Sequence, residues 1–504
     1  MSPRLPLLLA ASLLASCAQP GSSAAGSDAP EFATDIPESI VTPDTVDTRL
    51  GTLRFRDGFP DDDTVEAVYD QLDFSRGVET FLTGMPAASM HAMREGILGH
   101  GPANTTALLF EELMDSRTLF LTPNTESVYG VLWLDLSDGP MVLETPPDVL
   151  GFIDDAWFRY VLDFGRVGPD RGKGGTFALL PPDYDGPEPE GMHVARSRTY
   201  GHWVIWRGFL KDGSPAPAVA NVKEHLRVYP LGTPAAERPE MSFVNVSGKS
   251  FNTIHAMDRG FFDELDAVVQ SEPTTDLEPE VLGVWASVGI RRGKPFAPDA
   301  RMDGILTEAA AVGSATVRTL AYRPRDPETF FYEDSAWGTP FVGGSHEFID
   351  GDVRLLDARG YFFFYATGIT PAMAIRKVGA GSAYAVAFVD ADDAPLDGGR
   401  TYRLQLPTGI PARDFWSIVL YDNQTRSMLQ TDQQFPSLGS QAPDVVVNDD
   451  GSVDVYFGPE APDGHAANWI QTMPGKGYSV ILRLYGPEQS WFDKSWKPSE
   501  IESL

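Results

Sequence analysis

The chain is organised around residues 416–434, which read WSIVLYDNQTRSMLQTDQQ. The stretch begins with an apolar run typical of a β-strand and continues, without a glycine or proline, into a dense polar set. That polar set carries two carboxylates, a guanidinium, several amides and several hydroxyls. It is the most chemically loaded part of the sequence. The stretch therefore predicts a β domain in which one strand leads directly into a candidate site.

Strand patterns surround this stretch from residue 326 to the end of the chain. Short runs rich in β-branched and aromatic residues are separated by turn clusters such as residues 390–393 and 448–451. The number and spacing of the runs predict a sandwich or jelly roll over residues 326–504. The runs lie at residues 362–365, 383–389, 402–406, 415–421, 453–457 and 479–484.

A second group of strands is predicted over residues 105–236. Turn clusters separate these runs and no helical pattern comes between them, which favours an antiparallel sandwich. The runs lie at residues 128–134, 141–144, 158–164, 176–180 and 202–210.

Helical patterns occupy residues 237–325, between the two β regions. Apolar residues recur at helical spacing over residues 261–269 and 303–321, although Gly313 weakens the second pattern. The chain is therefore expected to be mainly β and multidomain, with a helical middle domain.

The segment of residues 46–104, which precedes the first β region, is also predicted to be helical. Asp63 and Glu66 have the spacing of a capping box, which marks a helix start. Pro86 suits the first turn of a second helix, because proline lacks the N–H that the first turn leaves unpaired.

The N-terminus carries the features of a lipoprotein signal peptide. Residues 5–14 form an apolar run that is too short to span a bilayer as a retained helix. Leu14-Ala15-Ser16-Cys17 then resembles the bacterial lipobox, in which the cysteine is lipidated and becomes the first residue of the mature protein. Residues 1–17 are thus predicted to be a signal peptide with lipobox, and residues 18–45 a flexible tether.

The expected location follows from that lipid anchor. Stable lipidation at Cys17 would hold the protein in the bacterial cell envelope. Ala18 lacks the aspartate that favours inner-membrane retention, so the outer membrane is the expected site, facing the periplasm or the exterior. Because Cys17 is the single cysteine, an intramolecular disulfide is excluded.

Charge restricts the expected partners. The 504 residues hold 71 acidic and 39 basic side chains, for a formal net charge of -32. Such a surface repels nucleic acid and anionic lipid headgroups, so neither is expected as a partner and the membrane is reached through the lipid alone. A small-molecule or glycan ligand is compatible with this charge, and a homo-oligomer stays open.

Familiar cofactor and hydrolase motifs are not matched. Residues 168–175 resemble a phosphate loop, but no Ser or Thr follows Lys173 and a strand pattern, not a helix, comes next. His346-Glu347 lacks the second histidine of a zinc protease, and no Gly-x-Ser-x-Gly elbow occurs. No cofactor or metal site is predicted, while a metal held by distant residues, or calcium in an acidic turn, stays open.

Two polar clusters are candidate sites, at residues 122–129 and in the opening stretch. The planar guanidinium of Arg426 suits a carboxylate, phosphate or sulfate. Asp422 or Glu126 would act as catalytic acid or base if burial raised its pKa. Alternatively, Arg426 pairs with Asp422 or Asp432 to close a corner between strands, because a buried guanidinium needs a partner to offset its desolvation.

Aromatic and amide side chains near these clusters complete the predicted binding surface. Aromatic residues would form a stacking wall, although aromatic residues in β domains are usually part of the core. The predicted substrate-binding residues, besides Arg426, are Asn124, Tyr129, Trp416, Tyr421, Asp432, Gln433 and Trp469.

The same residues resemble a bacterial family that pairs two domains of unknown function, numbered 1254 at the N-terminal side and 1214 at the C-terminal side. The first pattern is carried by residues 121–129, 133–136 and 139–140; the second by residues 365–373, 416–433, 449–456, 468–471 and 483–487. The resemblance covers nearly all of the chain beyond the tether. It implies an N-terminal immunoglobulin-like sandwich, a helical section and a C-terminal jelly-roll-like sandwich, and it brings no settled activity.

One departure from the family pattern affects a candidate residue. Relatives often read Asn-Asn-Asp or similar where this chain has Asn124-Thr125-Glu126, so the acid here is one carbon longer.

Two functions compete on these observations. The first is an envelope enzyme that acts on a polar, saccharide-like or ester-bearing substrate in a cleft between the two β domains. The second is a non-catalytic lipoprotein that binds a glycan or an envelope partner through the same surface. A deep pocket with an isolated acid of raised pKa would favour the enzyme, and a shallow aromatic groove with paired acids would favour the binder.

Overall fold

The computed structural model describes residues 32–374, 377–379 and 381–504. Cys17, its lipobox and the first part of the predicted tether lie outside the described residues. The described residues divide into two compact units, one that ends at residue 68 and one of residues 69–504. Among the described residues, no helix is both long enough and apolar enough to cross a membrane.

The described part of the first unit is a small antiparallel sheet that leads into a helix. A 3-10 turn, η1 (Glu38–Ile40), precedes strands β1 (Thr45–Thr48), β2 (Gly51–Arg56) and β3 (Phe59–Pro60), which form a sheet in the order β1-β2-β3. This region was predicted to be tether and helix. The strands are short and largely exposed, so they carry little of the apolar alternation by which strands are recognised.

Helix α1 (Asp62–Leu98) begins in the first unit and continues into the second. Its start is capped by Asp61, whose carboxylate accepts the backbone N–H of Thr64 at 2.9 Å, so the predicted capping box at Asp63 is two residues late. The prediction of a second helix starting at Pro86 is wrong, because α1 runs through that proline. Burial on both sides of Pro86 offsets the lost backbone hydrogen bond: Met85 and Ala88 are fully buried.

The first β region of the second unit contains two sheets. The larger has the order β14-β4-β6-β12-β8-β9 and the smaller has the order β11-β10-β7-β13, with β5 and β15 paired separately. The strands are β4 (Thr106–Leu109), β5 (Thr118–Leu119), β6 (Ser127–Asp135), β7 (Met141–Glu144), β8 (Val149–Asp155), β9 (Tyr160–Gly165), β10 (Thr176–Leu180), β11 (His193–Arg196), β12 (Gly201–Phe209), β13 (Arg227–Pro230), β14 (Ser242–Asn245) and β15 (Phe251–Asn252).

One face of each of the two larger sheets packs into a shared apolar core. Leu132 and Val204 of the six-stranded sheet meet Leu143 and Leu179 of the four-stranded sheet in this core. The region is not purely antiparallel, because β4 and β10 pair in parallel with β14 and β11. A short helix that the sequence did not reveal, α2 (Ala216–His225), lies between β12 and β13.

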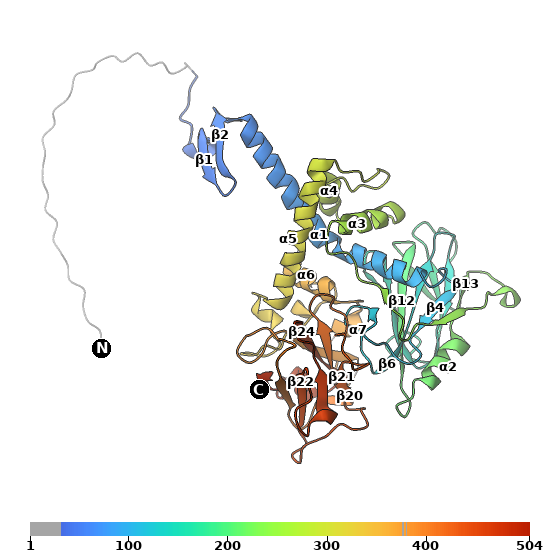
Figure 1. Ribbon diagram of the computed structural model, residues 1–504. Helices are drawn as coiled ribbons and strands as arrows, with labels where there is room; N and C mark the ends of the chain where they lie inside the picture. The colour runs from blue at the N-terminus through green and yellow to red at the C-terminus, as the bar shows by residue number, and fades with distance from the viewer. Residues whose placement is uncertain (1–31, 375–376, 380) are drawn as a thin grey trace, which may run out of the picture. The chain divides into compact units, whose positions relative to one another are not determined.

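A 3-10 turn, η2 (Ala235–Glu237), lies between β13 and β14. Three helices follow β15, namely α3 (Gly260–Ser271), α4 (Pro279–Ser287) and α5 (Ala300–Tyr322) (Figure 1). Gly313 has a packing reason to be in the middle of α5. A Cβ atom there would lie 2.6 Å from the ring of Phe81 in α1, so glycine permits the close approach of the two helices.

The predicted strand at residues 362–365 is wrong, because these residues form the last turn of α6 (Leu356–Tyr365). Every residue from 360 to 365 is buried, so the run has no exposed positions from which a helical period is visible. The other short elements here are η3 (Pro327–Thr329), η4 (Val342–Gly344), β16 (Ile349–Asp350), β17 (Val353–Arg354) and α7 (Pro371–Ala374).

The second β region also contains two sheets, in the orders β18-β24-β20-β21 and β23-β22-β19-β25. Alternate residues such as Ile418 and Leu482 of the first sheet pack against Leu404 and Val455 of the second. The elements are β18 (Ser382–Ala387), β19 (Tyr402–Leu406), β20 (Ala412–Asp422), β21 (Ser437–Gly439), β22 (Val453–Gly458), η5 (Ala466–Asn468), β23 (Trp469–Gln471), β24 (Tyr478–Pro487), α8 (Gln489–Phe492) and β25 (Glu502–Ser503).

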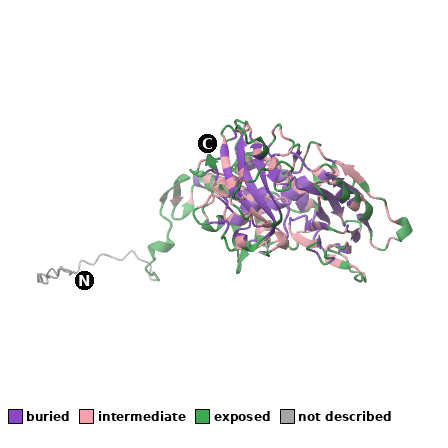
Figure 2. Ribbon diagram, turned by 90° about the horizontal axis from the view of Figure 1, so that it is seen from below, coloured by how far each residue is buried: buried purple, intermediate pink, exposed green. Residues whose placement is uncertain are grey.

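A third apolar cluster joins the two β regions. It contains the remaining faces of the two large sheets, including Ile205 of β12 and Ile481 of β24, together with side chains of α1, α3, α5 and α6. The buried residues accordingly concentrate in the sheets, whereas the strands of the first unit are exposed (Figure 2). The chain is thus mainly β with several helices. The immunoglobulin-like and jelly-roll-like topologies stay predictions.

Candidate functional site

A cavity lies between the two β regions of the second unit. One wall is the face of the six-stranded sheet that points away from its own sandwich, and the opposite wall comes from β18 and β24, with α6 and residues 366–373 beside them. The cavity encloses about 1130 Å³ of atom-free space, including solvent at its mouth. Its apolar lining includes Leu150, Phe152, Ile205, Phe341, Phe362 and Ile481.

Strand register determines which polar residues reach this cavity from the first β region. Strand β12 pairs with β6 and β8, so Arg207 lies opposite Tyr129 and Leu150. Strand β8 pairs with β9, so Asp163 lies opposite Phe152. Paired residues share a face of the sheet, and all five side chains line the cavity. Arg207 and Asp163 are two strands and two residues apart, which separates their Cα atoms by roughly 12 Å.

The second β region contributes another arginine, and strand register again determines its position. In β24, Arg483 lies opposite Tyr384 of β18, and Ile481 lies opposite Val386. These four residues also line the cavity. Two arginines from different β regions, Arg207 and Arg483, therefore face one space.

The two guanidinium groups carry positive charge that nearby carboxylates do not balance. Arg483 is 4% exposed and Arg207 is half-buried. Among the residues that the structure describes, neither forms an ion pair; the groups around them are mainly tyrosines, and each lies within electrostatic range of the other. A buried cation without a counter-ion is costly, so this wall favours an anionic ligand.

Arg483 is held in place by the rest of the protein, whereas Arg207 is not. Arg483 donates to the hydroxyl of Tyr421 and, through Nη2, to the carbonyl oxygen of Thr122 at 2.6 Å. No side-chain hydrogen bond from Arg207 to another described residue is formed. An arginine has five N–H donors, so both side chains keep donors for a ligand.

Glu126 is the acid within electrostatic range of Arg483. Its carboxylate accepts hydrogen bonds from the hydroxyl and the backbone N–H of Thr125, at 2.6 and 3.3 Å. Burial nevertheless raises the pKa of Glu126, which favours the neutral form and weakens it as a counter-ion. The Glu126 side chain is buried and does not line the cavity.

Asp163 is the carboxyl group that lines the cavity. Burial raises the pKa of Asp163 to about 6, while hydrogen bonds from Thr370 and Tyr160 oppose the rise. The hydroxyl of Thr370 donates to Asp163 at 2.6 Å. A carboxyl with a pKa near 6 exchanges protons readily near neutral pH, as a general acid or base requires.

Three buried hydroxyl groups complete the polar part of the lining. Tyr361, Thr367 and Ser382 all line the cavity, and their hydroxyl oxygens have no hydrogen-bond partner among the described residues. Buried polar atoms are normally paired, so three unpaired hydroxyls in the residues of one cavity wall are an unusual feature of this site. The cavity thus combines apolar walls, two cations, one titratable acid and several hydroxyls.

The two polar clusters singled out in the sequence do meet in the structure. The backbone N–H of Thr122 donates to the carbonyl oxygen of Arg426 at 3.0 Å, and the hydroxyl of Tyr421 donates to the carbonyl oxygen of Pro123. Their contact is made of backbone groups and buried hydroxyls. It joins the two β regions next to Arg483, and of the residues in this contact Thr122 also lines the cavity.

Asp422, one of the two predicted catalytic residues, closes the turn after β20. Its Oδ1 accepts the backbone N–H groups of Gln424 and Thr425, at 2.6 and 3.1 Å. Its Oδ2 forms an ion pair with Lys476 at 2.9 Å. All of its close partners are therefore internal to this corner.

Arg426 lies at the C-terminal end of α6 and is 1% exposed. Its Nε donates to the carbonyl oxygen of Phe364 at 3.2 Å, and its Nη1 donates to that of Gln424 at 2.9 Å. No ion pair with Asp422 or Asp432 forms. Burial lowers the pKa of Arg426 to about 10, and the carbonyls at the helix end supply the negative potential that stabilises the charge.

Replacing Arg426 should therefore reduce stability. Arg426→Ala takes the Nε donor from the carbonyl group of buried Phe364 and removes a large buried side chain, so we expect the free energy of unfolding to fall by about 2–4 kcal/mol. Urea denaturation measures this change. The matched control is the exposed Arg400, whose alanine variant should lie within about 0.5 kcal/mol of the wild type. Equal midpoints for the two variants would contradict this structural role.

The remaining predicted site residues are mainly structural. Of the ten, Tyr129 lines the cavity, and the other nine, all described, do not. The amide oxygen of Asn124 accepts the backbone N–H of Glu126 at 3.1 Å, which fixes the turn before β6. Trp416 is part of the second sandwich core. Asp432, Gln433 and Trp469 lie near one another at the surface, where Gln433 Nε2 donates to the carbonyl oxygen of Trp469 at 3.3 Å.

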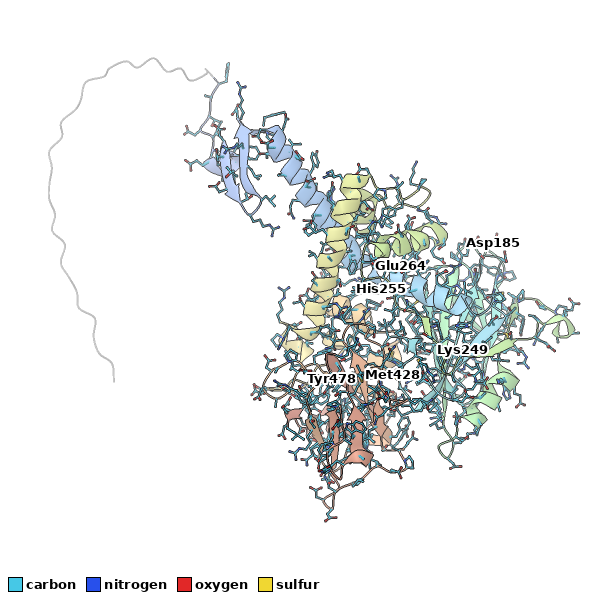
Figure 3. The ribbon with its side chains drawn as sticks, in the orientation of Figure 1. Asp185, Lys249, His255, Glu264, Met428 and Tyr478 are labelled. Carbon is cyan, nitrogen blue, oxygen red and sulfur yellow. The ribbon has the colours of Figure 1, made fainter. Side chains whose placement is uncertain are left out.

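A second group of titratable side chains lies at the start of α3 (Figure 3). Burial raises the pKa of Glu264 to about 7, and burial together with the charge of Arg426 lowers the pKa of His255 to about 3. Both side chains bond to Ala256: Glu264 accepts its N–H at 3.0 Å, and His255 Nδ1 lies 2.8 Å from its carbonyl oxygen. Neither lines a described cavity, so they serve to fix this loop.

Metal-ligating residues are not clustered in residues 32–374, 377–379 and 381–504. No three His, Cys, Asp or Glu side chains there are arranged to hold a metal ion.

The cavity residues that sequence reasoning missed share one signal. Arg207, Asp163 and Arg483 are single charged residues inside otherwise apolar strands. A charge at a position that strand alternation assigns to a buried face has to be paired or functional. The three lie far apart in sequence, and only strand register shows that they face one cavity.

A solved structure shares this fold. The chain is similar to the VPA0106 protein from Vibrio parahaemolyticus at 16% identity and a TM-score of 0.51, over 86% of this chain and 100% of that one. It is also similar to an uncharacterised protein from Burkholderia cenocepacia at 14% identity and a TM-score of 0.39, over 87% and 96% of the two chains. None of the curated proteins matches it.

Family models match both β regions. The model for DUF1254, a protein of unknown function, matches residues 104–230, and the model for DUF1214, also a protein of unknown function, matches residues 381–489. Their order along the chain agrees with the resemblance in the sequence. Residues of both matched segments line the cavity, including Arg207 from the first and Arg483 from the second. The chain therefore belongs to the family of proteins that pair a DUF1254 domain with a C-terminal DUF1214 domain.

Proposed function

We propose that the protein is an enzyme that binds a small amphipathic anion in the cavity between its two β regions and acts on it by acid–base chemistry at Asp163. The observation that carries this proposal is the pair of guanidinium groups, Arg207 and Arg483, that face an apolar cavity without a carboxylate partner among the described residues. The apolar lining favours an ester-bearing substrate over a saccharide, which would need a more polar wall.

The geometry assigns a role to each part of the cavity. The anionic head of the substrate binds Arg207 and Arg483, and its apolar body packs against Phe152 and Ile205. The Cα atoms of Arg207 and Asp163 are roughly 12 Å apart on one face of the sheet, so a substrate bound at Arg207 presents its far end to the Asp163 carboxylate. There Asp163 takes a proton from a water molecule as the water oxygen bonds to the ester carbonyl carbon. It returns that proton to the leaving alcohol oxygen, so ester and water become acid and alcohol.

A matched pair of ligands tests the anion site. In thermal-shift measurements on the full-length chain, 4-phenylbutyrate should raise the unfolding temperature, whereas its neutral isostere 4-phenylbutyramide should not. A ligand at about 100 times its dissociation constant stabilises the folded state by roughly 2.7 kcal/mol, which is readily detected. Equal shifts with the acid and the amide, or no shift with either, would count against the anion site.

A non-catalytic binding protein is the second candidate. The observation in its favour is the hydrogen bond from Thr370, which gives Asp163 an internal partner. Hydrolysis of mono(4-nitrophenyl) glutarate separates the two, because it joins a carboxylate to a chromogenic ester. The enzyme should release 4-nitrophenolate faster from this anion than from neutral 4-nitrophenyl butyrate. Binding of the anion without release of 4-nitrophenolate would favour the non-catalytic binding protein.

Several further assignments belong to the same proposal. Lipidation at Cys17 would hold the protein in the bacterial envelope, with the outer membrane as the expected location. The two β regions would be an immunoglobulin-like and a jelly-roll-like sandwich. The ligand would be a small molecule rather than nucleic acid, because the net charge of -32 opposes polyanions.

A further inference from the structure

A second cavity lies on the other side of residues 366–370. It is formed by the turn between β8 and β9, by residues 276–285, by residues 346–363 and by part of α1. It encloses about 1450 Å³ of atom-free space, including solvent at its mouth. Gly368 and Thr370 line the first cavity and Ile369 lines the second, so this segment separates the two. The backbone N–H of Ile369 donates to buried Asp154 at 2.9 Å, which holds the segment in place.

Four arginines line this second cavity: Arg159, Arg198, Arg354 and Arg359. Such a concentration is unexpected in a chain with 71 acidic and 39 basic residues. Two of the four share one carboxylate: Asp155 lies 3.0 Å from Arg159 and 3.7 Å from Arg198. The positive charge in this cavity therefore exceeds what its close ion pairs balance.

Arg354 and Arg359 have no carboxylate partner among the residues that the structure describes. Arg354 donates to the carbonyl oxygen of Glu347 at 2.6 Å. Arg359 is half-buried, its guanidinium lies 5.2 Å from the centre of the Phe363 ring, and it forms no side-chain hydrogen bond within the described part of the chain. Burial and the charge of Arg354 lower the pKa of Arg359 to about 10, although the more distant charge of Glu79 in α1 acts in the opposite direction.

The carboxylates that line the cavity are not in close contact with these arginines. Asp276, Glu278 and Glu347 line it, but none of them forms an ion pair with the four arginines in the described residues. Aromatic rings, including Phe158, Phe348 and Phe363, make up much of the remaining wall. Guanidinium groups beside aromatic rings suit a ligand that joins a planar apolar ring to an oxyanion.

We propose that the second cavity is a separate anion-binding site, in which Arg359 binds the phosphate or carboxylate group of an aryl-bearing small molecule. This site is distinct from the cavity between the two β regions, and its arginines do not line that cavity. The protein then binds two anions, one on each side of residues 366–370.

Isothermal titration of the full-length chain with phenyl phosphate tests this proposal. The wild type should bind at two sites. Arg359→Gln should weaken one of them by about tenfold or more, since a charge-assisted hydrogen bond contributes about 1.5–3 kcal/mol. Arg207→Gln should weaken the other site and leave this one unchanged. The exposed Arg400→Gln is the matched control and should titrate like the wild type.

The outcomes separate the two cavities. If Arg359→Gln titrates like the wild type, or if all binding is lost in Arg207→Gln, the second site does not exist. If Arg207→Gln titrates like the wild type while Arg359→Gln loses a site, the second site stands and the proposed function of the first cavity fails. Near-ultraviolet circular dichroism of each variant reports folding. Arg359→Lys keeps the charge and should restore most of the affinity.

Discussion

Arg207→Gln is expected to weaken the binding of 4-phenylbutyrate by about ten- to a hundredfold, without loss of stability. A hydrogen bond to a charged group contributes about 1.5–3 kcal/mol, and each 1.4 kcal/mol changes the dissociation constant tenfold. Arg207 forms no ion pair with the described residues, so its removal deprives the ligand of a partner but leaves no internal group unpaired. Titration calorimetry at fixed ionic strength measures the affinity, because added salt weakens such contacts.

Arg483→Gln provides a contrasting result. Arg483 also bonds to Tyr421 and to the carbonyl oxygen of Thr122. Its replacement should therefore reduce both ligand affinity and stability, whereas Arg207→Gln reduces affinity alone. Arg400→Gln should change neither. Unchanged affinity in both Arg207→Gln and Arg483→Gln would remove the basis for an anion site in this cavity.

Asp163→Asn is expected to lower the rate of hydrolysis of mono(4-nitrophenyl) glutarate by about 10²- to 10⁴-fold, with KM nearly unchanged. A positioned general base contributes about this much to a rate, and an amide cannot accept the proton. In the wild type the rate should rise as pH increases through about 6, where the Asp163 carboxyl loses its proton. Asp432→Asn, at an exposed acid, is the control and should hydrolyse the ester at the wild-type rate.

Asp163→Asn, which should lower the hydrolysis rate, should raise the stability of the folded protein at alkaline pH. Because the pKa of Asp163 is raised to about 6 in the folded state, above about 3.9 in the unfolded chain, the folded state holds this proton more tightly. Stability from this group is present below pH about 4 and is lost as pH rises through about 6. Asp163→Asn should therefore be more stable than the wild type at pH 8, with the difference shrinking as pH falls toward 4. A less stable variant that also loses activity would instead indicate a purely structural role.

Local sequence patterns predicted most of the longer strands and helices, although β8 and α2 were missed. The runs at residues 141–144, 176–180 and 402–406 coincide with β7, β10 and β19, because their alternation and turn residues are local properties. The errors occur where tertiary packing overrides the pattern. Pro86 lies inside α1 because packing on both sides offsets its missing hydrogen bond, and residues 362–365 are helical although their uniform burial hides the helical period.

The candidate site was harder to predict, because it depends on strand register. Arg207, Asp163 and Arg483 are brought to one cavity by pairings among five strands of two β regions, and no local spacing encodes these pairings. The dense polar stretch after β20 was predicted to be a site because many functional groups lie close together in its sequence. In the structure they satisfy one another and the end of α6, as Asp422 and Arg426 illustrate. Tyr129 was found because it belongs to a strand that borders the cavity.

A crystal structure of the full-length chain with 4-(4-bromophenyl)butyrate tests the central claim most directly, because the anomalous signal of bromine locates the ligand. We expect the carboxylate within hydrogen-bond distance of both Arg207 and Arg483, and the bromophenyl ring packed against Phe152 and Ile205, with the bromine toward Asp163. A ligand bound elsewhere, or a carboxylate turned away from both arginines, would contradict the account of the cavity as an anion site.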